Sequence, residues 1–570
     1  MNNRTSSGSA QNPSLGSASL SDLFQEAMAL HQCGQLLQAQ LLYEKILHAQ
    51  PQNADALHLS GLIAWQLKDH QKAADLIAKA ICVNPGNPAY HLNLGIAMKE
   101  LRQFSAAVSS YDNALAVQPA YAAAHYSRGN ALCDLKCFDE AVASYDKAIA
   151  LQPNDVFAHL NRGLALQELN QLDAAIGSFD QALAIDPNFA EAYLNKSIAL
   201  RRLMRLDEAM AANDKAIALQ PLNPLAHSNR GLALHERNQL GAAVDAFDRA
   251  IAIDPAYADA YFHKSLSLLL AGNFSAGWDY YEWRWKRKSA VATGRSFIQP
   301  LWTGSESLQG KTILLYGEQG LGDSLQFCRY AKSVSDLGAH VILEVQQPVV
   351  GVLQGLDGVH HLIAAGTELP PFDYQCPLLS LPQVFKTDAG NIASTHAYLQ
   401  ADAAAVAKWT GRMGEKTKPR VGLVWSGNGA HSNDHNRSLN LAHMLAHLPV
   451  GVEFVSLQKE LRPADQATLE SNPHILHFGE DLNDFSDTAA LCSLMDVVVS
   501  VDTSVAHLSA ALGQRTWILL PFSPDWRWLL NRTDSPWYAS VALYRQQAPG
   551  DWTTAFEMLK KDIQNLILSK

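Results

Sequence analysis

Seven prolines recur at a spacing of 34 residues, and this period constrains the first half of the chain more than any other feature. They are Pro51, Pro85, Pro119, Pro153, Pro187, Pro221 and Pro255. A fixed period of this length indicates one folded unit copied in series. From Pro85 on, a small residue lies 24 positions before each proline: Gly61, Gly95, Gly129, Gly163, Ser197 and Gly231. Small residues let two helices approach closely, and a proline ends the second helix of each unit.

Alanines follow the same period in two further columns, which begin at Ala73 and Ala80. Together these residues resemble the tetratricopeptide repeat, a helix-turn-helix unit that stacks into a superhelix. Counting from the glycines predicts eight repeats, with first residues at Leu20, Ala54, Pro88, Ala122, Val156, Ala190, Pro224 and Ala258. The last repeat is degenerate, with Gly277 and Arg284 at the alanine positions. Its aromatic block is expected to dock onto the next domain: Trp278, Tyr280, Tyr281, Trp283 and Trp285.

Asparagine recurs two positions before the small residue of four repeats: Asn93, Asn161, Asn195 and Asn229. An amide offers both a donor and an acceptor to a peptide backbone. The column therefore predicts an acceptor groove on the first helix of each pair. The alternative is that these amides bond a neighbouring repeat or are merely tolerated at exposed sites. The column resembles the one in the repeats of the eukaryotic O-linked N-acetylglucosamine transferase, which implies a protein partner there.

Composition and charge exclude several classes of function. The net charge of −11 leaves no basic surface, so no nucleic-acid partner is expected. No apolar run approaches the roughly 20 residues of a membrane span. Residues 1–19 are rich in Ser, Asn and Gly and read as a disordered tail without a signal peptide. Seven scattered cysteines, without a Cys-x-x-Cys motif, favour a reducing cytoplasm.

After the repeats, which are predicted over residues 20–289, short apolar runs alternate with helical stretches. The expected strands are Thr312–Tyr316, His340–Val345, Arg420–Trp425, Glu453–Leu457, Val497–Val501 and Thr516–Leu520. Strands that alternate with helices predict parallel, doubly wound α/β sheets. We expect a linker over 290–310, one such domain over 311–414, a second over 415–545, and a C-terminal helix in 546–570 that packs on the first domain. Two such domains facing a cleft correspond to the glycosyltransferase fold termed GT-B.

Three polar loops follow expected strands. The first, residues 317–325, is glycine-rich and opens a helix near Asp323. Asp323 is expected at or near the N-cap of that helix, and capping can coexist with a functional role, because the carboxyl end of the strand faces the cleft. The Gly-x-x-Gly-x-Gly order of this loop is not the dinucleotide-binding fingerprint.

The second loop, residues 425–439, holds Ser426, Asn428 and Arg437. The planar guanidinium of an arginine suits a diphosphate. His431 and His435 lack a third ligand nearby, so hydrogen bonding is favoured over metal binding and no metal site is predicted.

The third loop follows Val497–Val501 and contains Asp502, Thr503, Ser504 and His507. Thr503 and Ser504 either cap the next helix or present its free N–H groups to a phosphate.

The motifs Gly-Leu-Gly-Asp-Ser-Leu and Asp-Thr-Ser-Val-Ala-His-Leu, in this order, resemble the ADP-heptose:lipopolysaccharide heptosyltransferase family over roughly residues 311–543. The resemblance implies that Asp323 is the catalytic base. It implies a donor site formed by Ser426, Asn428, Arg437, Asp502, Thr503, Ser504 and His507. Two departures stand out: Arg437-Ser-Leu replaces a usual lysine and tryptophan, and a Pro-Asp-Trp-Arg-Trp segment runs from Pro524 to Trp528.

The whole layout looks closer to bacterial glycosyltransferases that carry repeats, some of which are thought to modify flagellin or other proteins. It implies a cytoplasmic, metal-independent, inverting glycosyltransferase without a cofactor. Its donor would be a nucleotide-sugar and its acceptor a protein held by the repeats. Two alternatives remain open: a scaffold whose transferase domain no longer turns over, and an enzyme that acts on the lipopolysaccharide core.

Overall fold

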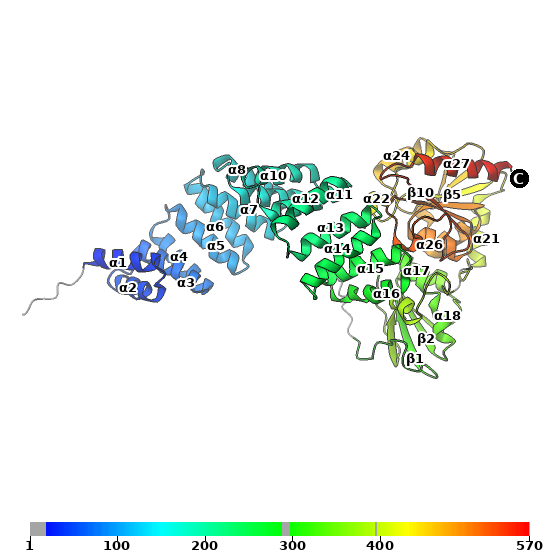
Figure 1. Cartoon of the computed structure of the whole chain (residues 1–570), viewed down its shortest axis with the longest axis horizontal. Coiled ribbons are helices and arrows are strands. Elements are labelled where there is room, and N and C mark those ends of the chain that lie inside the picture. The colour runs from blue at the N-terminus through cyan, green and yellow to red at the C-terminus, as the bar shows by residue number, and fades with distance from the viewer. Residues whose placement is uncertain (1–18, 288–296, 394–395, 432, 569–570) are drawn as a thin grey trace, which may run out of the picture. The chain divides into compact units, whose positions relative to one another are not determined.

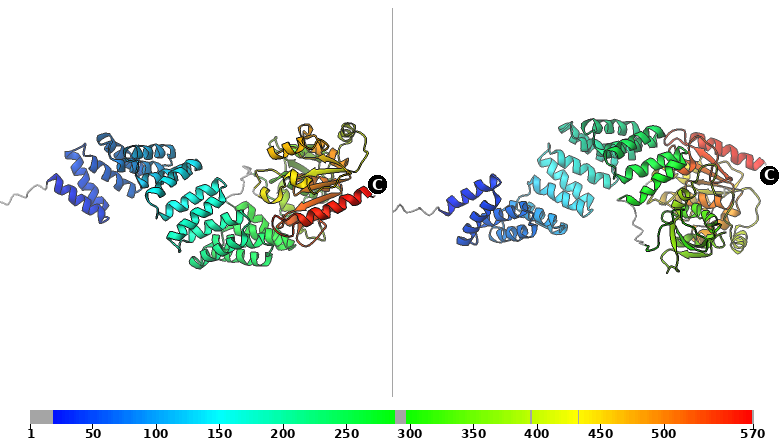
Figure 2. Two further views of the ribbon diagram at one scale, coloured as in Figure 1. Left: turned by 90° about the horizontal axis from the view of Figure 1, so that it is seen from above. Right: turned by 60° about the horizontal axis from the view of Figure 1, so that its bottom comes forward.

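A computed structural model describes residues 19–287, 297–393, 396–431 and 433–568, in two compact units that comprise residues 1–219 and 220–570. The expected disordered tail, apart from Ser19, lies outside the described residues. In unit 1, six helix pairs are stacked in chain order (Figures 1 and 2). Their bounds are α1 Leu20–Gln32, α2 Leu36–Ala49, α3 Ala54–Gln66, α4 His70–Val83, α5 Pro88–Glu100, α6 Phe104–Val117, α7 Ala122–Asp134, α8 Phe138–Leu151, α9 Val156–Glu168, α10 Leu172–Ile185, α11 Ala190–Arg202 and α12 Leu206–Leu219.

Unit 2 opens with two further pairs, α13 Pro224–Glu236 with α14 Leu240–Ile253, and α15 Ala258–Leu270 with α16 Phe274–Tyr281. The first helix of every pair begins at the residue that the 34-residue period predicts for its repeat, so the predicted repeat starts are confirmed. Pro51 and its equivalents each follow the second helix by two residues. The last repeat is degenerate, as expected, because α16 is short and continues as the 3₁₀ helix η1, Glu282–Lys286.

Between the two helices of each pair, the chain turns at a residue whose backbone has a left-handed conformation, with positive φ. After α3, Lys68 has φ +64° and its N–H donates to the carbonyl of Trp65, while the N–H of Asp69 donates to that of Ala64. These two bonds form a Schellman motif, which satisfies carbonyls that the helix end leaves free. The same position recurs every 34 residues, at Gly34, Lys68, Arg102, Lys136, Asn170, Met204, Asn238 and Gly272.

The glycine column sets how closely the paired helices approach. A Cβ on Gly163 would lie 2.5 Å from Cε1 of the buried Phe179, and one on Gly129 would lie 2.6 Å from Cε1 of Tyr145. Ser197 is the one non-glycine residue of this column, and it faces Asn213 instead of a ring. Its Oγ donates to Asn213 Oδ1 over 2.9 Å. Where an aromatic ring lies on the second helix, the glycine on the first helix therefore provides the space that the ring needs.

We predict that Gly163→Ala destabilises unit 1 although alanine is the better helix former. The new methyl must displace Phe179, and overpacking of this kind costs about 1–3 kcal/mol. This cost exceeds the helix propensity that alanine gains over glycine, which is about 1 kcal/mol. Urea unfolding followed by circular dichroism should show a lower midpoint. Gly177→Ala, in the same helix pair, is the matched control, because a Cβ at Gly177 meets nothing within 4 Å. Its midpoint should rise. Equal shifts in the two variants would contradict the packing argument.

Two parallel sheets make up the rest of unit 2. The first has the order β3-β2-β1-β4 and the second the order β10-β9-β8-β5-β6-β7. The strands of both sheets pair in parallel among the described residues, for example Leu314 beside Ile342 and Leu423 beside Val499. The bounds are β1 Thr312–Tyr316, β2 His340–Val345, β3 His361–Ala364, β4 Tyr374–Pro377, β5 Arg420–Val424, β6 Glu453–Ser456, β7 Leu476–His477, β8 Val497–Val501, β9 Thr516–Leu520 and β10 Val541–Arg545.

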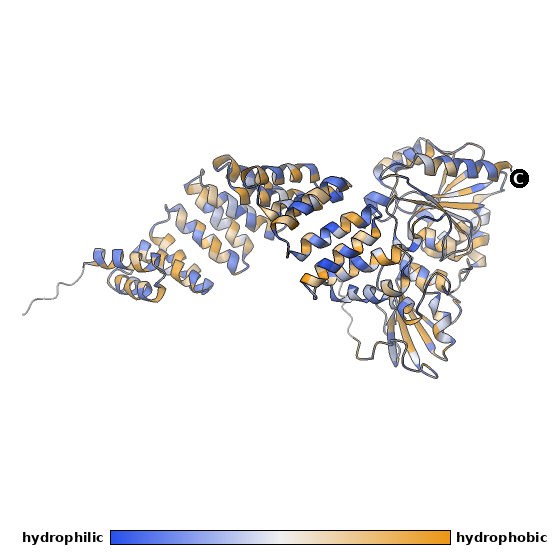
Figure 3. Cartoon of the chain, viewed as in Figure 1, coloured by the Kyte–Doolittle hydropathy of each residue, from blue (hydrophilic) through white to orange (hydrophobic). Residues whose placement is uncertain are grey.

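Short helices lie between these strands, and the longer helix α27 follows the last strand. They are α17 Leu321–Phe327, α18 Tyr330–Ser335, α19 Gln347–Val350, η2 Gly351–Leu353, η3 Leu378–Ser380, α20 Leu381–Val384, α21 Ala403–Met413, α22 Asp434–Arg437, α23 Leu441–Leu445, α24 Pro463–Glu470, η4 Gly479–Asp481, α25 Phe485–Ser493, α26 Ser504–Ala511, η5 Trp526–Trp528 and α27 Thr553–Leu568. The strands are largely hydrophobic, whereas the helices carry alternating hydrophobic and hydrophilic stripes (Figure 3). This is the pattern of buried parallel sheets covered by helices.

All six expected strands exist, two of them one residue shorter than predicted. Four strands were missed, namely β3, β4, β7 and β10, and β3, β4 and β7 have four residues or fewer. Part of the predicted linker belongs to the first sheet, because Leu301 forms a parallel bridge to Gln375 of β4 and Trp302 is buried. Residues 290–296 of that linker lie outside the described residues.

The expected packing of the C-terminal helix is wrong. Helix α27 packs on the second sheet, where Phe556, Leu559 and Ile563 share a core with Val421 and Val499. The physical reason is the short connection: α27 follows β10, the edge strand of that sheet, after only seven residues. Its apolar stripe therefore meets the nearest uncovered sheet face.

The aromatic block of the last repeat docks in part. Trp278 is buried, donates its Nε1–H to the carbonyl of Thr387 over 2.9 Å and meets the ring of Trp526 edge-on at 5.2 Å. Trp283 instead stacks on Tyr261 within the same helix pair, with ring centroids 3.7 Å apart. One core thus contains Trp278 together with strand residues of both sheets.

Candidate functional site

The three predicted loops follow the strands at which the order of each sheet reverses. In the first sheet this point lies between β1 and β4, and residues 317–325 follow β1. In the second sheet it lies between β5 and β8, and the other two loops follow those two strands. Open α/β sheets bind ligands outside the carboxyl ends of the strands at this switch point. The topology therefore gives all three loops the position of a binding site.

Glycine lets the first and third loops meet. A Cβ on Gly322 would lie 3.0 Å from Cδ2 of His507 and 3.5 Å from the Cα of Ser504. Helix α17 accordingly packs beside α26, the helix that the third loop opens (Figure 1). At Gly322 the glycine-rich loop therefore makes room for a neighbouring helix.

Asp323 has two partners. It is the third residue of α17, and its Oδ2 accepts the N–H of Gly320 over 2.8 Å, so the expected capping is confirmed. Its Oδ1 accepts from Nη2 of Arg527. The other nitrogens of Arg527 are also bonded: Nη1 donates to Asp525 Oδ1 over 2.9 Å, and Nε donates to Gln326 Oε1 over 2.6 Å. Burial raises the pKa of Asp323, and the charge of Arg527 opposes that rise.

Sequence reasoning missed Arg527 as a site residue. It lies in the segment that departs from the heptosyltransferase pattern, 204 positions from Asp323, and it joins the two sheets. The unusual density of aromatic and charged residues from Asp525 to Trp528 was the available signal.

Arg437 reaches the third loop from the second. Its Nη1 donates to the carbonyl of Asp502 over 3.0 Å, and its buried Nε–H has no hydrogen-bond partner among the described residues. Gly427 gives it room, since a Cβ there would lie 2.7 Å from Nη2. Arg437 therefore has one buried donor that no described protein group accepts.

The other two predicted residues of the second loop lie differently. Ser426 is buried, and its backbone exchanges hydrogen bonds with the side chain of Gln458. Asn428 is exposed, and its Oδ1 accepts the N–H of Ala430 over 2.9 Å. Among the described residues, neither side chain has a hydrogen bond or ion pair to Arg437.

The third loop holds a buried acid and a buried histidine. Burial and the nearby charge of Asp525 raise the pKa of Asp502 to about 6. His507 shares a hydrogen bond of 2.9 Å with Tyr538 and stacks on Trp528, and burial together with nearby arginines lowers its pKa. Its Nε2 lies 4.0 Å from Asp502 Oδ1.

The two hydroxyl residues of this loop differ. Thr503 is the N-cap of α26, but its Oγ1 pairs with Ser500 Oγ over 3.2 Å and does not cap the helix. Ser504 is half-buried at the first turn, beside Gly322. The residues brought together are therefore Asp323, Arg437, Asp502, Ser504 and His507.

His431 accepts the N–H of Asn433 at its Nδ1 over 3.2 Å, and His435 is exposed. Within the described ranges, no three His, Cys, Asp or Glu side chains are grouped so as to hold a metal ion. In the same ranges, no helix combines the length and apolar character of a membrane span.

The four asparagines of the repeat column have different partners. Nδ2 of Asn161 donates to Tyr126 and to Asn130 of the preceding helix pair, each over 3.0 Å, and Asn93 bonds His58 over 2.8 Å. Asn195 donates to the carbonyl of Glu191 in its own helix. Asn229 is buried in unit 2, and its Nδ2 has no partner among the described residues. Bonding to a neighbouring repeat, the stated alternative, therefore holds for two of the four.

We predict that Asn161→Ala lowers stability and that Asn195→Ala, the matched control, does not. The first variant loses two bonds between helix pairs, each worth about 0.5–1.5 kcal/mol, whereas the second loses one bond within an exposed helix turn. Urea midpoints of the full chain measure the difference. A neutral Asn161→Ala variant would return this residue to the groove interpretation.

A period-34 charge pattern also ties the repeats together and was missed. A basic residue of the first helix pairs with an aspartate 16 positions earlier: Arg128 with Asp112 (2.7 Å), Arg162 with Asp146 (2.6 Å), Lys196 with Asp180 (2.5 Å) and Lys264 with Asp248 (2.6 Å). Their regular spacing in the sequence was the signal.

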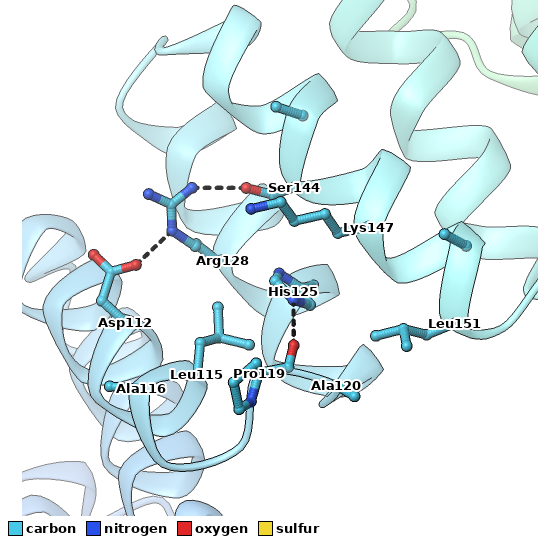
Figure 4. Close-up of a pocket in the computed structure, with 12 residues that line it drawn as sticks. Asp112, Leu115, Ala116, Pro119, Ala120, His125, Arg128, Ser144, Lys147 and Leu151 are labelled. Atoms are coloured by element: carbon cyan, nitrogen blue, oxygen red, sulfur yellow. Dashed lines mark hydrogen bonds and ion pairs between the residues drawn. The ribbon is translucent and has the colours of Figure 1, made fainter.

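Arg128 belongs to an open groove of about 700 Å³ between α6, α7 and α8 (Figure 4). Leu115, Pro119 and Leu151 supply apolar walls, and Lys147 and His125 supply polar ones. His125 bonds the carbonyl of Pro119 over 3.0 Å, and Arg128 is held by Asp112 and by Ser144 Oγ (2.8 Å).

Family models agree with the helix pairs. A model described as tetratricopeptide repeat matches residues 24–91 and 160–224, and one described as TPR repeat matches residues 129–170 and 231–267. Among curated proteins, Protein FlbA of Caulobacter vibrioides is 27% identical over 312 residues, which cover 50% of this chain and 51% of FlbA. The chain therefore spans about half the length of this relative.

Similar solved structures are repeat proteins. YrrB, described as a TPR protein with an unusual peptide-binding site, is 24% identical, with 34% of this chain and all of YrrB covered and a TM-score of 0.31. The C-terminal part of a TPR repeat-containing protein from Cytophaga hutchinsonii is 18% identical, with 42% and 98% covered and a TM-score of 0.36. The family models and the 34-residue helix pairs together identify the helical part of this chain as tetratricopeptide repeats.

Proposed function

We propose that this chain is a glycosyltransferase that moves a sugar from a nucleotide-sugar donor to a protein acceptor held by its repeats. One observation carries the proposal: the loops after the switch-point strands of two parallel sheets meet, with a carboxylate from one sheet and an arginine with unused donors from the other. Sugar transfer from a diphosphate requires a base for the acceptor hydroxyl and a group that binds the departing anion.

On the donor side, Arg437 and the first turn of α26 would bind the diphosphate. The unused Nε–H of Arg437 and the free N–H groups from Ser504 on are both donors to phosphate oxygens. Their positive charge would stabilise the electron pair that stays on the diphosphate when its bond to the anomeric carbon breaks. This proposal gives the arginine and the helix the role that a metal ion has in other transferases.

On the acceptor side, Asp323 would take the proton of the acceptor hydroxyl as its oxygen attacks the anomeric carbon. The ion pair with Arg527 favours the charged carboxylate, which a base requires, against the effect of burial, although it also occupies one oxygen. Binding of the diphosphate would draw Arg527 away and free that oxygen. The acceptor itself would be a protein, flagellin or another bacterial protein, because arrays of this repeat bind polypeptides.

A second candidate is a scaffold without turnover. The observation that favours it is the same Arg527 ion pair, because a carboxylate held by a buried arginine and a capping bond has a purely structural explanation. Fold and site geometry do not by themselves establish activity.

A thermal-shift screen of the full chain separates the two candidates. We expect ADP, GDP, UDP or CDP, or one of their sugar conjugates, to raise the melting temperature, since a ligand at 100 times its Kd stabilises by about 2.7 kcal/mol. The corresponding nucleosides, which lack the diphosphate, serve as controls and should have little effect. If no diphosphate shifts the melting temperature more than its nucleoside, the scaffold is the better description.

A further inference from the structure

A charged cluster lies at the carboxyl end of the first sheet. The loops after β1 and β4, which flank its switch point, carry Glu318 and Ser380. Between these two side chains lies Arg284, which belongs to η1 at the end of the last repeat and is 6% exposed. The position at which such sheets receive ligands is thus occupied by a side chain of the repeats.

Arg284 bridges the two loops directly. Its Nη2 donates to Glu318 Oε1 over 3.1 Å and to Ser380 Oγ over 2.7 Å. Its Nη1 donates to Glu282 Oε1 over 2.5 Å, and Ser380 in turn donates to the carboxylate of Glu282 over 3.0 Å. The neighbouring Gln319 also pairs with the repeat, through the hydroxyl of Tyr281 at 3.4 Å.

Glu318 is a costly residue to bury. Its side chain is 2% exposed, and its Oε2 has no hydrogen-bond partner among the described residues. Burial raises its pKa to about 7, the charge of Arg284 opposes the rise, and that of Asp323 adds to it. The other titratable group linked to this carboxylate is the thiol of Cys376, whose pKa burial raises, and Glu282 lies on the far side of Arg284.

We propose that Arg284 is a positioning residue for the glycine-rich loop, so that the last repeat completes the acceptor side of the site. Arg284 holds Glu318, and Tyr281 of the same repeat holds Gln319. The Glu318 contact thereby helps to set the course of the loop whose Gly320 N–H fixes Asp323. The role of Asp323 in this inference rests on the proposed function. The anchoring of the loop does not.

Arg284→Met tests the anchoring without any substrate. The variant leaves Glu318 without its cation, so the pKa of that carboxylate rises further. A folded-state pKa raised above the unfolded value gives stability that is lost as the pH rises through it. We expect a melting temperature close to that of the wild type at pH 5.5 and several degrees below it at pH 8.5. Measured against Glu318→Gln alone, the double variant Arg284→Met/Glu318→Gln should show a deficit that is the same at pH 5.5 and pH 8.5.

The same variants test positioning. Arg284→Met should lower transfer at least tenfold while the affinity for the nucleoside diphosphate from the screen stays within twofold, and Arg284→Lys should recover part of the loss. Arg287→Met is the matched control, because Arg287 pairs with Asp259 inside the last repeat, at 2.6 Å. Arg287→Met should change neither the transfer rate nor the affinity for the nucleoside diphosphate.

Each contrary outcome has one meaning. A melting deficit of Arg284→Met that is equal at both pH values overturns the anchoring of Glu318 by Arg284. So does a pH-dependent deficit of the double variant relative to Glu318→Gln. Normal transfer by Arg284→Met overturns the positioning role. A wild-type chain that transfers from no donor overturns the proposed function, while the melting comparison still decides whether Arg284 anchors the loop.

Discussion

Asp323→Asn is expected to lower sugar transfer by about 10²–10⁴-fold, the contribution typical of a general base. The amide keeps the shape of the side chain and an oxygen for the Gly320 N–H, but it cannot take up the acceptor proton. Arg527 retains Asp525 as a charged partner, so no unpaired charge is left buried and the fold should persist. Turnover with a labelled donor, together with nucleotide affinity and melting temperature, measures the separation of chemistry from folding.

The pH dependence of transfer sharpens this test. A protonated carboxyl is no base, so the rate should fall as the pH drops through the pKa of Asp323. Because burial raises that pKa, the fall should begin at a higher pH than for an exposed aspartate of pKa about 3.9.

The control for Asp323→Asn is Asp402→Asn. Asp402 also caps a helix, accepting the N–H of Ala405 over 2.8 Å, but it lies at the start of α21 and none of its contacts described here involves the three loops. That variant should retain transfer. If Asp323→Asn also turns over like the wild type, Asp323 is a cap and an interdomain ion-pair partner only.

Arg437→Ala is expected to weaken binding of the nucleoside diphosphate by about 10–100-fold. The estimate corresponds to the loss of one charge-assisted hydrogen-bonding group, worth about 1.5–3 kcal/mol. Isothermal titration calorimetry of the full chain measures it directly. The affinity of Arg437→Lys should lie between those of the wild type and Arg437→Ala, since lysine keeps the charge but lacks the planar guanidinium group.

Arg412→Ala is the matched control for Arg437. Arg412 pairs with Asp481 over 2.6 Å and lies on α21, away from the three loops. Its removal should leave the affinity unchanged. An Arg437→Ala variant that binds as tightly as the wild type would remove Arg437 from the donor site.

The sequence determined what depends on local pattern. The 34-residue period located the start of every helix pair, because each small residue and proline acts on its own turn of helix. The buried strands β1, β2, β8 and β9 were located to the residue, since continuous apolar runs mark strands covered on both faces. Loops that follow such strands could be singled out because parallel strands present their carboxyl ends at one edge.

Tertiary structure alone decided which side chains share that edge. Arg527 lies 204 positions from Asp323, and Arg284 lies 34 positions from Glu318, in a repeat whose pattern marked it only as an irregularity. Neither pair has a spacing that a helix or strand period would reveal. The same holds for α27, whose amphipathic stripe predicted burial but not the sheet that it covers. Ion pairs and packing between distant segments depend on the path of the whole chain, whereas helix and strand periods depend only on neighbours.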